Sequence, residues 1–283
     1  MIAARRRQRG IALLVVLWAC TLLAVLLGGY AMLARTEGMQ ARYQFAQAQA
    51  HYAAEAGLAR AIVGLQAQQP AQRWIADGRA YDFRFDNAQL HVSAIDENGK
   101  VDLNAGSPQV LQGLFRAAGL REDEAQRLAR AVVDWRSFVP LGASAPTDGL
   151  YAGRDYAPRH APFASLEELQ QVAGMTPALY VRVAPVITLW SGRESPDQGS
   201  APPLALAAIP GMTPEQAAEI AAARTKPQPT GLVAGGGVTH SIRSEAMLAD
   251  GTRAVLRATI RLQGARSGAQ PYAVLHWQEG EEE

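Results

Sequence analysis

Cysteine and lysine are nearly lacking from this sequence: its 283 residues include one cysteine, Cys20, and two lysines, Lys100 and Lys226. A single cysteine excludes an intramolecular disulfide framework and a multi-cysteine zinc site. An excess of one charge is lacking as well, because 27 basic side chains nearly balance 26 acidic ones. A protein held mainly on a nucleic-acid backbone usually has a basic excess, so this balance argues against that class.

Motifs for catalysis and nucleotide binding are also missing. The five histidines are scattered, and none belongs to an H-E-x-x-H pair for a metal. The sequence has no G-x-S-x-G nucleophile elbow, no G-x-x-x-x-G-K-[ST] phosphate loop and no G-x-G-x-x-G. We therefore expect no enzyme, and we interpret Cys20 as a small packing residue within an apolar helix.

The N-terminus is the most strongly patterned part of the chain. Residues 1–10 carry four arginines and no acid, and residues 11–33 follow without a charge. A helix over 11–33 would span roughly 34 Å at about 1.5 Å per residue, which is enough to cross a bilayer core. The basic cluster predicts a cytoplasmic N-terminus, with the chain after Arg35 on the other side of the membrane.

Three interpretations of this N-terminus compete. A cleaved secretory signal would have a shorter apolar region and an A-x-A-like cleavage site, whereas a plain signal anchor fits well. In the third interpretation, Arg9-Gly10 followed by the apolar run from Ile11 resembles the class III leader of type IV pilins and pseudopilins. That resemblance implies that a prepilin peptidase cuts after Gly10 and methylates the new N-terminus at Ile11.

Position 15 indicates which pilin-like family the chain resembles. Most pilin-like proteins carry a glutamate five residues after the cut, where this chain has Val15. The glutamate is missing from the type II secretion system protein K family, the large minor pseudopilins, which this chain resembles. A carboxylate in a membrane helix is costly unless it meets a partner charge, such as the N-terminal amine of the subunit above. Val15 therefore suits a subunit with nothing above it, at the tip of a filament.

The pattern of apolar residues predicts the fold. We expect the N-terminal helix to continue to about Ala67, since apolar residues recur at helical spacing and no proline occurs before Pro70. Alternation predicts β-hairpins over 81–94 and 240–262, and a last strand follows from Tyr272 to Trp277. The part between the hairpins is helical in pattern. The predicted class is α+β: a pilin-like long N-terminal helix on an antiparallel β-sheet, interrupted by a large all-helical inserted domain.

The predicted domains follow from these elements. They are a cleaved class III leader at 1–10, the transmembrane part of the helix at 11–33, a pilin-like domain with helix and first strands at 34–104, an inserted helical domain at 105–225, and closing strands with an acidic tail at 226–283. Capping boxes are predicted at Ser165–Glu168 and Thr213–Gln216.

An internal repeat lies within the helical part. Leu169–Pro177 echoes Leu206–Pro214, and each copy has the pattern of a helix end, a glycine turn and a capped helix. This pattern resembles a helix-hairpin-helix, whose DNA-binding members hold phosphate on the amides of a G-x-G turn. Thr176 and Thr213 replace the second glycine here, which favours a hairpin used for packing.

The resemblance to protein K extends through the helical part. Segments 98–104 and 161–169 and the pair Asp134-Trp135 are similar to the family's sequence, in the same order. Family members can bind calcium in the loop after Asp-Trp, but this chain continues with Arg136 and Ser137 in place of further aspartates. The remaining calcium candidates are Asp134, Asp148 and Asp155. They offer fewer oxygens than the six to eight that calcium takes, unless carbonyls and waters contribute.

The resemblance also implies a function. It implies a minor pseudopilin at the tip of the type II secretion pseudopilus, which initiates or caps filament assembly for protein export across the outer membrane. The implied partners are other minor pseudopilins, the prepilin peptidase and the inner-membrane secretion platform, with secreted cargo or the outer-membrane pore as further contacts. The implied location is the bacterial inner membrane, crossed once, with the soluble domain in the periplasm. Arg253, Arg257 and Arg261 share one strand face, which is either a solvated face or a docking strip for an acidic partner.

Two alternatives stay open at this point. The first is a membrane-anchored DNA-handling protein that uses the helix-hairpin-helix units. Removal of residues 1–10 would remove four arginines, leaving 23 basic against 26 acidic side chains and a net charge of −3, which weakens this alternative. The second is a type IV pilus minor pilin, which would be expected to keep the carboxylate that Val15 lacks.

Overall fold

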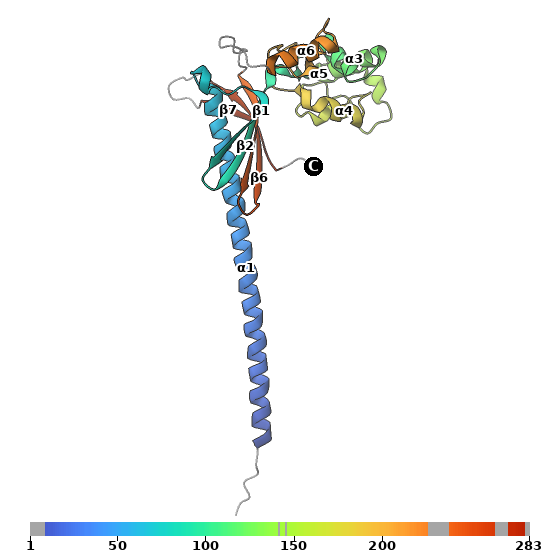
Figure 1. The fold of residues 1–283 in the computed structure, drawn as a ribbon. Helices are drawn as coiled ribbons and strands as arrows, with labels where there is room; N and C mark the ends of the chain where they lie inside the picture. Colours follow the sequence, from blue (N-terminus) through green and yellow to red (C-terminus); the bar gives the residue numbers. More distant parts are fainter. Residues whose placement is uncertain (1–8, 141, 145, 226–237, 264–270, 281–283) are drawn as a thin grey trace, which may run out of the picture.

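One helix forms the long axis of the molecule. The computed structural model describes residues 9–140, 142–144, 146–225, 238–263 and 271–280. Helix α1 runs from Arg9 to Gln66 as one element, which confirms the predicted continuous helix. Its N-terminal half stands alone as a shaft, and its C-terminal half packs on the sheet (Figure 1).

A five-stranded antiparallel sheet packs against the C-terminal half of α1. Its strands are β1 (Asp77–Phe85), β2 (Ala88–Asp96), β5 (Thr239–Leu248), β6 (Arg253–Leu262) and β7 (Tyr272–Glu279). They lie in the order β1-β2-β5-β6-β7, with all neighbours antiparallel. Both predicted hairpins and the last strand are confirmed. Strand β2 pairs with β5, so the chain between them leaves the sheet and returns beside its point of departure.

Alternating apolar residues of the sheet form a core with α1. Leu90, Val92, Ile242, Leu256 and Ile260 point into this core and are fully or almost fully buried. Small helix residues let the backbone approach the sheet closely. A Cβ added at Gly57 would lie 2.2 Å from Ser244 Oγ and 3.0 Å from Val92 Cγ2, so a larger residue there would displace side chains of the sheet.

The chain between β2 and β5 forms a helical unit with a core of its own. Its α-helices are α2 (Pro108–Ala117), α3 (Glu122–Arg136), α4 (Pro177–Val183), α5 (Pro203–Leu206) and α6 (Pro214–Thr225). Leu111, Leu114, Phe115, Leu128 and Trp135 are among its buried residues. The unit lies to one side of the sheet, at the end away from the shaft (Figure 1). The predicted fold class is thereby confirmed.

Short elements complete the fold. The 3-10 turns are η1 (Pro70–Gln72), η2 (Glu97–Gly99), η3 (Asp148–Tyr151), η4 (Glu167–Gln171) and η5 (Ala184–Val186). A parallel pair, β3 (Val101–Asp102) and β4 (Ile187–Thr188), joins the segment that enters the helical unit to the chain after η5, and β4 lies within the 105–225 region where the sequence pattern indicated helix.

One predicted helix cap is confirmed and one is wrong. Thr213 Oγ1 accepts the Gln216 N–H at 3.2 Å and Gln216 Oε1 accepts the Thr213 N–H at 3.0 Å, which is the predicted capping box. The predicted box at Ser165–Glu168 is wrong, because η4 begins at Glu167 and its first flanking residue, Leu166, makes no side-chain cap bond. A 3-10 segment of five residues has no α-helical first turn whose amides such a box could satisfy.

Candidate functional site

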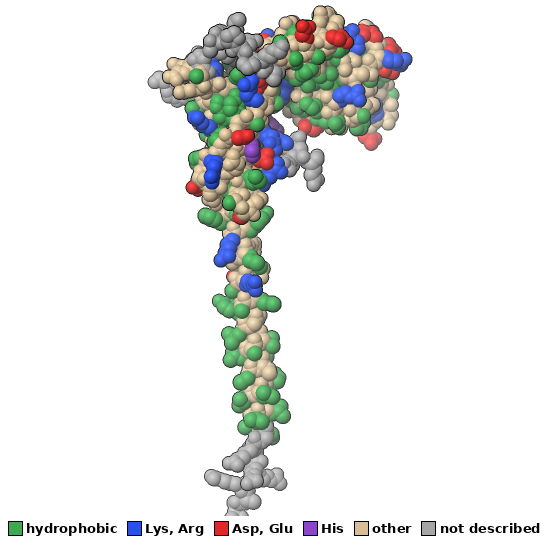
Figure 2. All heavy atoms as spheres, in the orientation of Figure 1, with side chains coloured by type: hydrophobic (Ala, Val, Ile, Leu, Met, Phe, Trp, Pro, Cys, Tyr) green, Lys and Arg blue, Asp and Glu red, His purple; other side chains and the backbone are tan. Residues whose placement is uncertain are grey.

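The N-terminal half of α1 carries the residues predicted for processing and for tip position. One helix of the described chain is long and apolar enough to cross a membrane, and its first residues are the uncharged run from Ile11. Hydrophobic side chains cover this shaft up to the first basic residues above it (Figure 2). Gly10 and Ile11 lie in the first turn of the helix, while residues 1–8 of the predicted leader lie outside the described residues. Cleavage after Gly10 stays a prediction.

Val15 lies one turn further along the same helix. Its side chain is 58% exposed and, like its apolar neighbours, contacts no other part of the described fold. A side chain at this position would therefore face lipid or another subunit. A carboxylate here would need a partner charge from outside the chain, and Val15 needs none.

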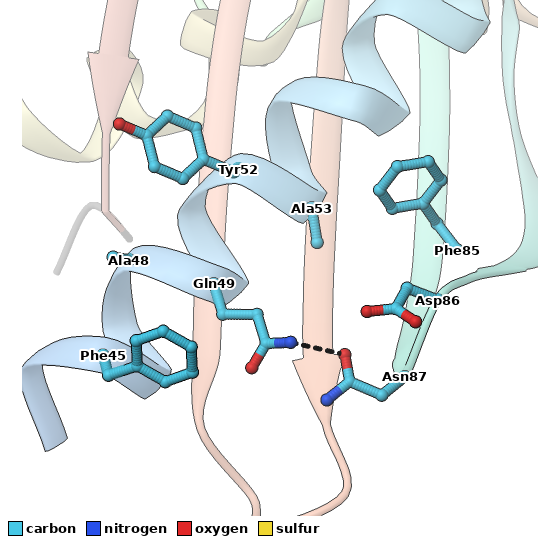
Figure 3. A pocket seen from close by; sticks show the side chains of 8 residues that line it. All are labelled: Phe45, Ala48, Gln49, Tyr52, Ala53, Phe85, Asp86 and Asn87. Carbon is cyan, nitrogen blue, oxygen red and sulfur yellow. Dashed lines mark hydrogen bonds between the residues drawn. The ribbon is translucent and has the colours of Figure 1, made fainter. Parts of the chain in front are cut away.

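An apolar groove lies where α1 meets the turn between β1 and β2. It has a volume of about 310 Å³ and is lined by Phe45, Ala48, Gln49, Tyr52 and Ala53 of the helix and by Phe85, Asp86 and Asn87 of the turn. Gln49 Nε2 donates to Asn87 Oδ1 at 3.0 Å and ties the two walls together (Figure 3). The side chains of Phe45, Tyr52 and Phe85 are exposed by half or more.

The sequence analysis did not identify this groove, since its walls are separated by about forty residues. The local signal is Phe45 and Tyr52, two aromatic residues outside the apolar spacing predicted for the helix, whereas Phe85 belongs to the apolar face predicted for the hairpin. Such exposed apolar surface, rimmed by polar groups, is typical of a protein–protein contact.

The three arginines of β6 have different surroundings. Arg253 Nε donates to Glu245 Oε1 at 2.5 Å, and Arg243 Nη1 donates to the other oxygen of that carboxylate at 2.8 Å. The hydrogen bond from Arg253 is the main reason that the pKa of Glu245 lies below its usual value. Arg257 pairs in register with Arg243 on one side and with Gln278 on the other.

Arg261 reaches toward the helical unit. Its Nη2 lies 3.4 Å from the carbonyl oxygen of Trp190, and its Nε lies 3.4 Å from Thr239 Oγ1. Of the arginines predicted as a docking strip, Arg253 is thus paired with Glu245, and Arg261 is directed toward the helical unit. A docking role for Arg253, Arg257 and Arg261 stays a prediction.

The segment from Asn98 to Asn104 connects the sheet to the helical unit. A Cβ added at Gly99 would lie 2.6 Å from the carbonyl carbon of Ser200, so the close approach requires glycine. Asn104 Nδ2 donates to the Phe163 carbonyl at 3.1 Å, and Asn104 Oδ1 accepts the Phe163 N–H at 2.7 Å. These contacts join segments 98–104 and 161–169, which are the two segments that are similar to protein K in sequence.

Arg136 completes this connection. Its guanidinium donates to the carbonyl oxygens of Leu103 at 2.6 Å and Gly106 at 2.7 Å. Burial lowers the pKa of Arg136, while the nearby Asp102 carboxylate opposes that shift. The arginine that follows Asp134-Trp135 therefore binds backbone carbonyls of the connecting segment.

Of the calcium candidates, Asp134 lies in the last turn of α3 and Asp148 and Asp155 lie between α3 and η4, but the three carboxylates do not converge. Asp134 Oδ2 accepts the Thr147 N–H at 3.2 Å. Asp148 and Asp155 line one shallow cavity of about 530 Å³ together with Tyr151, Arg154, Tyr156 and His160. Asp148 Oδ1 lies 3.2 Å from His160 Nε2.

The donor set of this loop does not fit calcium. Calcium takes six to eight oxygen ligands, and among the described residues no group of three or more His, Cys, Asp or Glu side chains could hold a metal ion. Burial raises the pKa of the Tyr151 hydroxyl, which accepts the Ala173 N–H at 2.9 Å and is thereby engaged with the protein. We therefore assign no step or role to a metal here.

The two helical repeats have the predicted shape. Each has a glycine with positive φ, +94° at Gly174 and +84° at Gly211, before a threonine that precedes a helix. Thr176 Oγ1 accepts the Leu179 N–H at 3.3 Å, and Thr213 Oγ1 accepts the N–H of Gln216. These threonines bind amides at the helix N-termini, which makes those amides less available to a phosphate group.

These features together define a class of protein. A long helix with an apolar N-terminal half, laid on an antiparallel sheet that a helical unit interrupts, is the architecture of a pilin-like protein with an inserted helical domain. Residues 87–192 match the family model described as type II secretion system (T2SS), protein K. This match covers the second strand of the hairpin, the connecting segment and much of the helical unit.

A solved structure shares the fold. The chain is similar to GspK in the crystal structure of the GspK–GspI–GspJ complex of the type 2 secretion system from enterotoxigenic Escherichia coli. The TM-score is 0.57 and the identity 18%, over 88% of this chain and 100% of that chain. A comparison with curated proteins found no match. The family match and the shared fold together support a type II secretion system protein K, which confirms the predicted resemblance.

Proposed function

We propose that this protein is the minor pseudopilin at the tip of a type II secretion pseudopilus, where it initiates or caps filament assembly. The tip position is inferred from Val15, an apolar residue whose side chain is exposed on the N-terminal half of α1. Inside a filament of membrane-anchored subunits, a carboxylate at this position could pair with the N-terminal amine of the next subunit. A subunit with valine there offers no such contact and suits the end of the filament.

The proposed location follows from α1 and its basic leader. The protein crosses the inner membrane once, with its N-terminus in the cytoplasm and the sheet and helical unit in the periplasm. The prepilin peptidase removes residues 1–10, and the inner-membrane platform of the secretion system holds the subunit during assembly. The protein acts through its contacts and not through an active site, because its sequence has none of the catalytic motifs named above and the described residues form no group of three or more His, Cys, Asp or Glu that could hold a metal ion.

The groove between α1 and the β1–β2 turn is the proposed contact for a companion minor pseudopilin. A subunit anchored in the same membrane presents a helix roughly parallel to α1, and the groove opens beside α1 just above the shaft (Figure 1, Figure 3). The solved relative was crystallised as a complex with GspI and GspJ, which supports a companion of that kind. Phe45 and Phe85 supply apolar area from both walls of the groove.

Co-purification of the full chain in detergent with candidate minor pseudopilins tests this proposal. We expect a stable complex, and we expect Phe45→Ser to reduce recovery of the companion several-fold because it removes a wall of the groove. Phe138→Ser is the matched control, since Phe138 is 82% exposed on the helical unit, far from the groove. Failure of every candidate to bind, or a loss caused only by Phe138→Ser, would contradict the proposal.

The two alternatives predict different results. A DNA-handling protein would bind duplex DNA at low salt and release it steeply as salt rises. A type IV pilus minor pilin would affect piliation, whereas the proposed function predicts that deletion of the gene stops secretion of exported proteins. A neighbouring set of genes for small pilin-like proteins and a secretion ATPase would distinguish these systems further.

A further inference from the structure

We propose that His160 takes the place of a calcium ion in the loop between α3 and η4, and that the helical unit of this chain is held together without a divalent cation. The imidazole lies between groups from two parts of the loop. Its Nε2 is 3.2 Å from Asp148 Oδ1, and its Nδ1 is 3.2 Å from the carbonyl oxygen of Asp134. Both of these groups are acceptors, so the ring donates to both of them only as the imidazolium, whereas the neutral imidazole donates to one of them.

His160 lies where a cation bound by both Asp134 and Asp148 would lie. Asp134 lies in the last turn of α3 and Asp148 is the first residue of η3, so the ring links α3 to η3. A second link runs beside it, from the Thr147 N–H to Asp134 Oδ2. One carboxylate oxygen of Asp134, one of Asp148 and the carbonyl oxygen of Asp134 are therefore engaged with protein groups.

In the part of this loop that the structure describes, the remaining side-chain oxygens do not complete a calcium shell. Asp155 is exposed on the rim of the cavity. Thr147 Oγ1 is buried without a hydrogen-bond partner among the described residues, but one hydroxyl oxygen adds little toward the six to eight that calcium takes. The chain has Arg136 and Ser137 in the place where protein K relatives that bind calcium would have aspartates, and Arg136 binds backbone carbonyls instead.

Positive charge on the cavity wall also opposes a cation. The guanidinium of Arg154 lies 5.5 Å from the centre of the Tyr151 ring and 5.6 Å from the centre of the Tyr156 ring. Its Nη1 donates to the Tyr156 hydroxyl at 2.5 Å. This arginine lines the same cavity as Asp148 and Asp155, so a divalent ion would have to approach against a charge of the same sign.

The backbone at His160 supports a dedicated contact. Its φ is +51°, in the left-handed region that residues other than glycine seldom occupy. Strained residues of this kind persist where surrounding contacts determine their conformation. The ring contacts to Asp134 and Asp148 are such contacts.

Thermal unfolding of the full chain in detergent, with millimolar CaCl₂ and with EGTA, tests the inference. We expect the same Tm in both, and no calcium in the purified protein by elemental analysis. His160→Gly keeps the backbone conformation without strain and removes the ring. We expect this variant to have a lower Tm by several degrees in both conditions, with several-fold faster trypsin cleavage after Arg154 and Arg159. Asp155→Asn is the control for Tm and should leave it unchanged, and cleavage is compared with the wild type at Arg154, whose neighbouring residues are the same in His160→Gly.

Two results would overturn the inference. The first is a Tm of the wild-type chain that rises by several degrees with calcium and loses this response in Asp148→Asn. The second is a His160→Gly chain with wild-type Tm and wild-type cleavage rates. The Tm of the wild-type chain with and without calcium shows whether the protein binds calcium, even if a variant does not fold. Neither result bears on the tip position, which is tested by co-purification and secretion.

Discussion

The carboxylate of Asp102 accepts a hydrogen bond from the backbone N–H of Gly192, with 2.7 Å between Oδ2 and the nitrogen, although 90 residues separate the two positions. Ser191 Oγ donates to the same oxygen at 3.1 Å, and Oδ1 accepts the N–H groups of Asn104 at 2.8 Å and Ala105 at 3.0 Å. Asp102 is almost fully buried where the chain enters the helical unit. It thus holds the beginning of that unit to the segment between β4 and α5.

Asp102→Asn tests this relationship. The new amide NH₂ would face N–H donors and leave buried groups unsatisfied, so we expect the free energy of unfolding to fall by about 2–4 kcal/mol. Urea unfolding of the full chain in detergent, followed by tryptophan fluorescence, measures the change. Asp155→Asn, on an exposed carboxylate, should stay within about 0.5 kcal/mol of the wild type. Equal effects of the two variants would contradict a special role for Asp102.

Gly113→Ala should destabilise the helical unit, even though alanine is the better helix former. A Cβ at Gly113 would lie 2.2 Å from the carbonyl oxygen of Ala208, so α2 would have to move away from its neighbour. We expect a loss of about 1–3 kcal/mol in urea unfolding. Gly38→Ala is the matched control, because a Cβ there meets nothing within 4 Å and the exposed helix should gain about 0.5–1 kcal/mol. A stabilising Gly113→Ala would show that the close contact is absent.

The pair of Arg253 and Glu245 should make stability depend on acid pH. The pKa of Glu245 lies below its ordinary value of 4.5, mainly because Arg253 donates to it. A carboxyl with a lowered pKa in the folded state stabilises the fold above its unfolded pKa, and this contribution is lost as pH falls through the folded pKa. We expect Arg253→Gln to lose about 0.5–1 kcal/mol at pH 7 and almost nothing near pH 2. Urea unfolding at both pH values measures this, and an equal loss at both would contradict it.

The parts of the fold with local patterns were predictable from the sequence. Alternation and the Asp250-Gly251 turn gave the closing hairpin, and a capping box marked the start of α6. The β3–β4 pair was not predictable, because it joins Val101–Asp102 to Ile187–Thr188 through two residues on each side, too few for a period to appear.

The candidate sites show the same division. Val15 and the apolar run from Ile11 are local features that can be read from the sequence alone. The groove needs Phe45 and Phe85 from separate elements, and the His160 contact needs a backbone conformation that no motif indicates. Asp134, Asp148 and Asp155 were therefore predictable from the sequence, whereas the contact of His160 with Asp148 was not.

The predicted leader can be tested by mass spectrometry of the protein purified from cells that contain the prepilin peptidase. We expect the mature chain to begin at Ile11 with a methylated N-terminus. Gly10→Val, which changes only the residue before the cut, should leave the full precursor in the membrane. An intact leader on the wild-type protein in peptidase-competent cells would exclude this processing.

Val15→Glu tests the tip position most directly. The substitution places a carboxylate on the exposed face of the shaft, where a neighbouring subunit's amine could pair with it, so the chain should still enter the membrane. We expect the variant to behave as an ordinary filament subunit and no longer as the end of the filament, and secretion to fall several-fold at normal protein levels. Val15→Leu keeps an apolar side chain at the same position and should secrete like the wild type. Secretion assays on cells that carry each variant, with membrane levels measured in parallel, compare the two. Normal secretion by Val15→Glu would remove the argument that the missing carboxylate places this subunit at the tip.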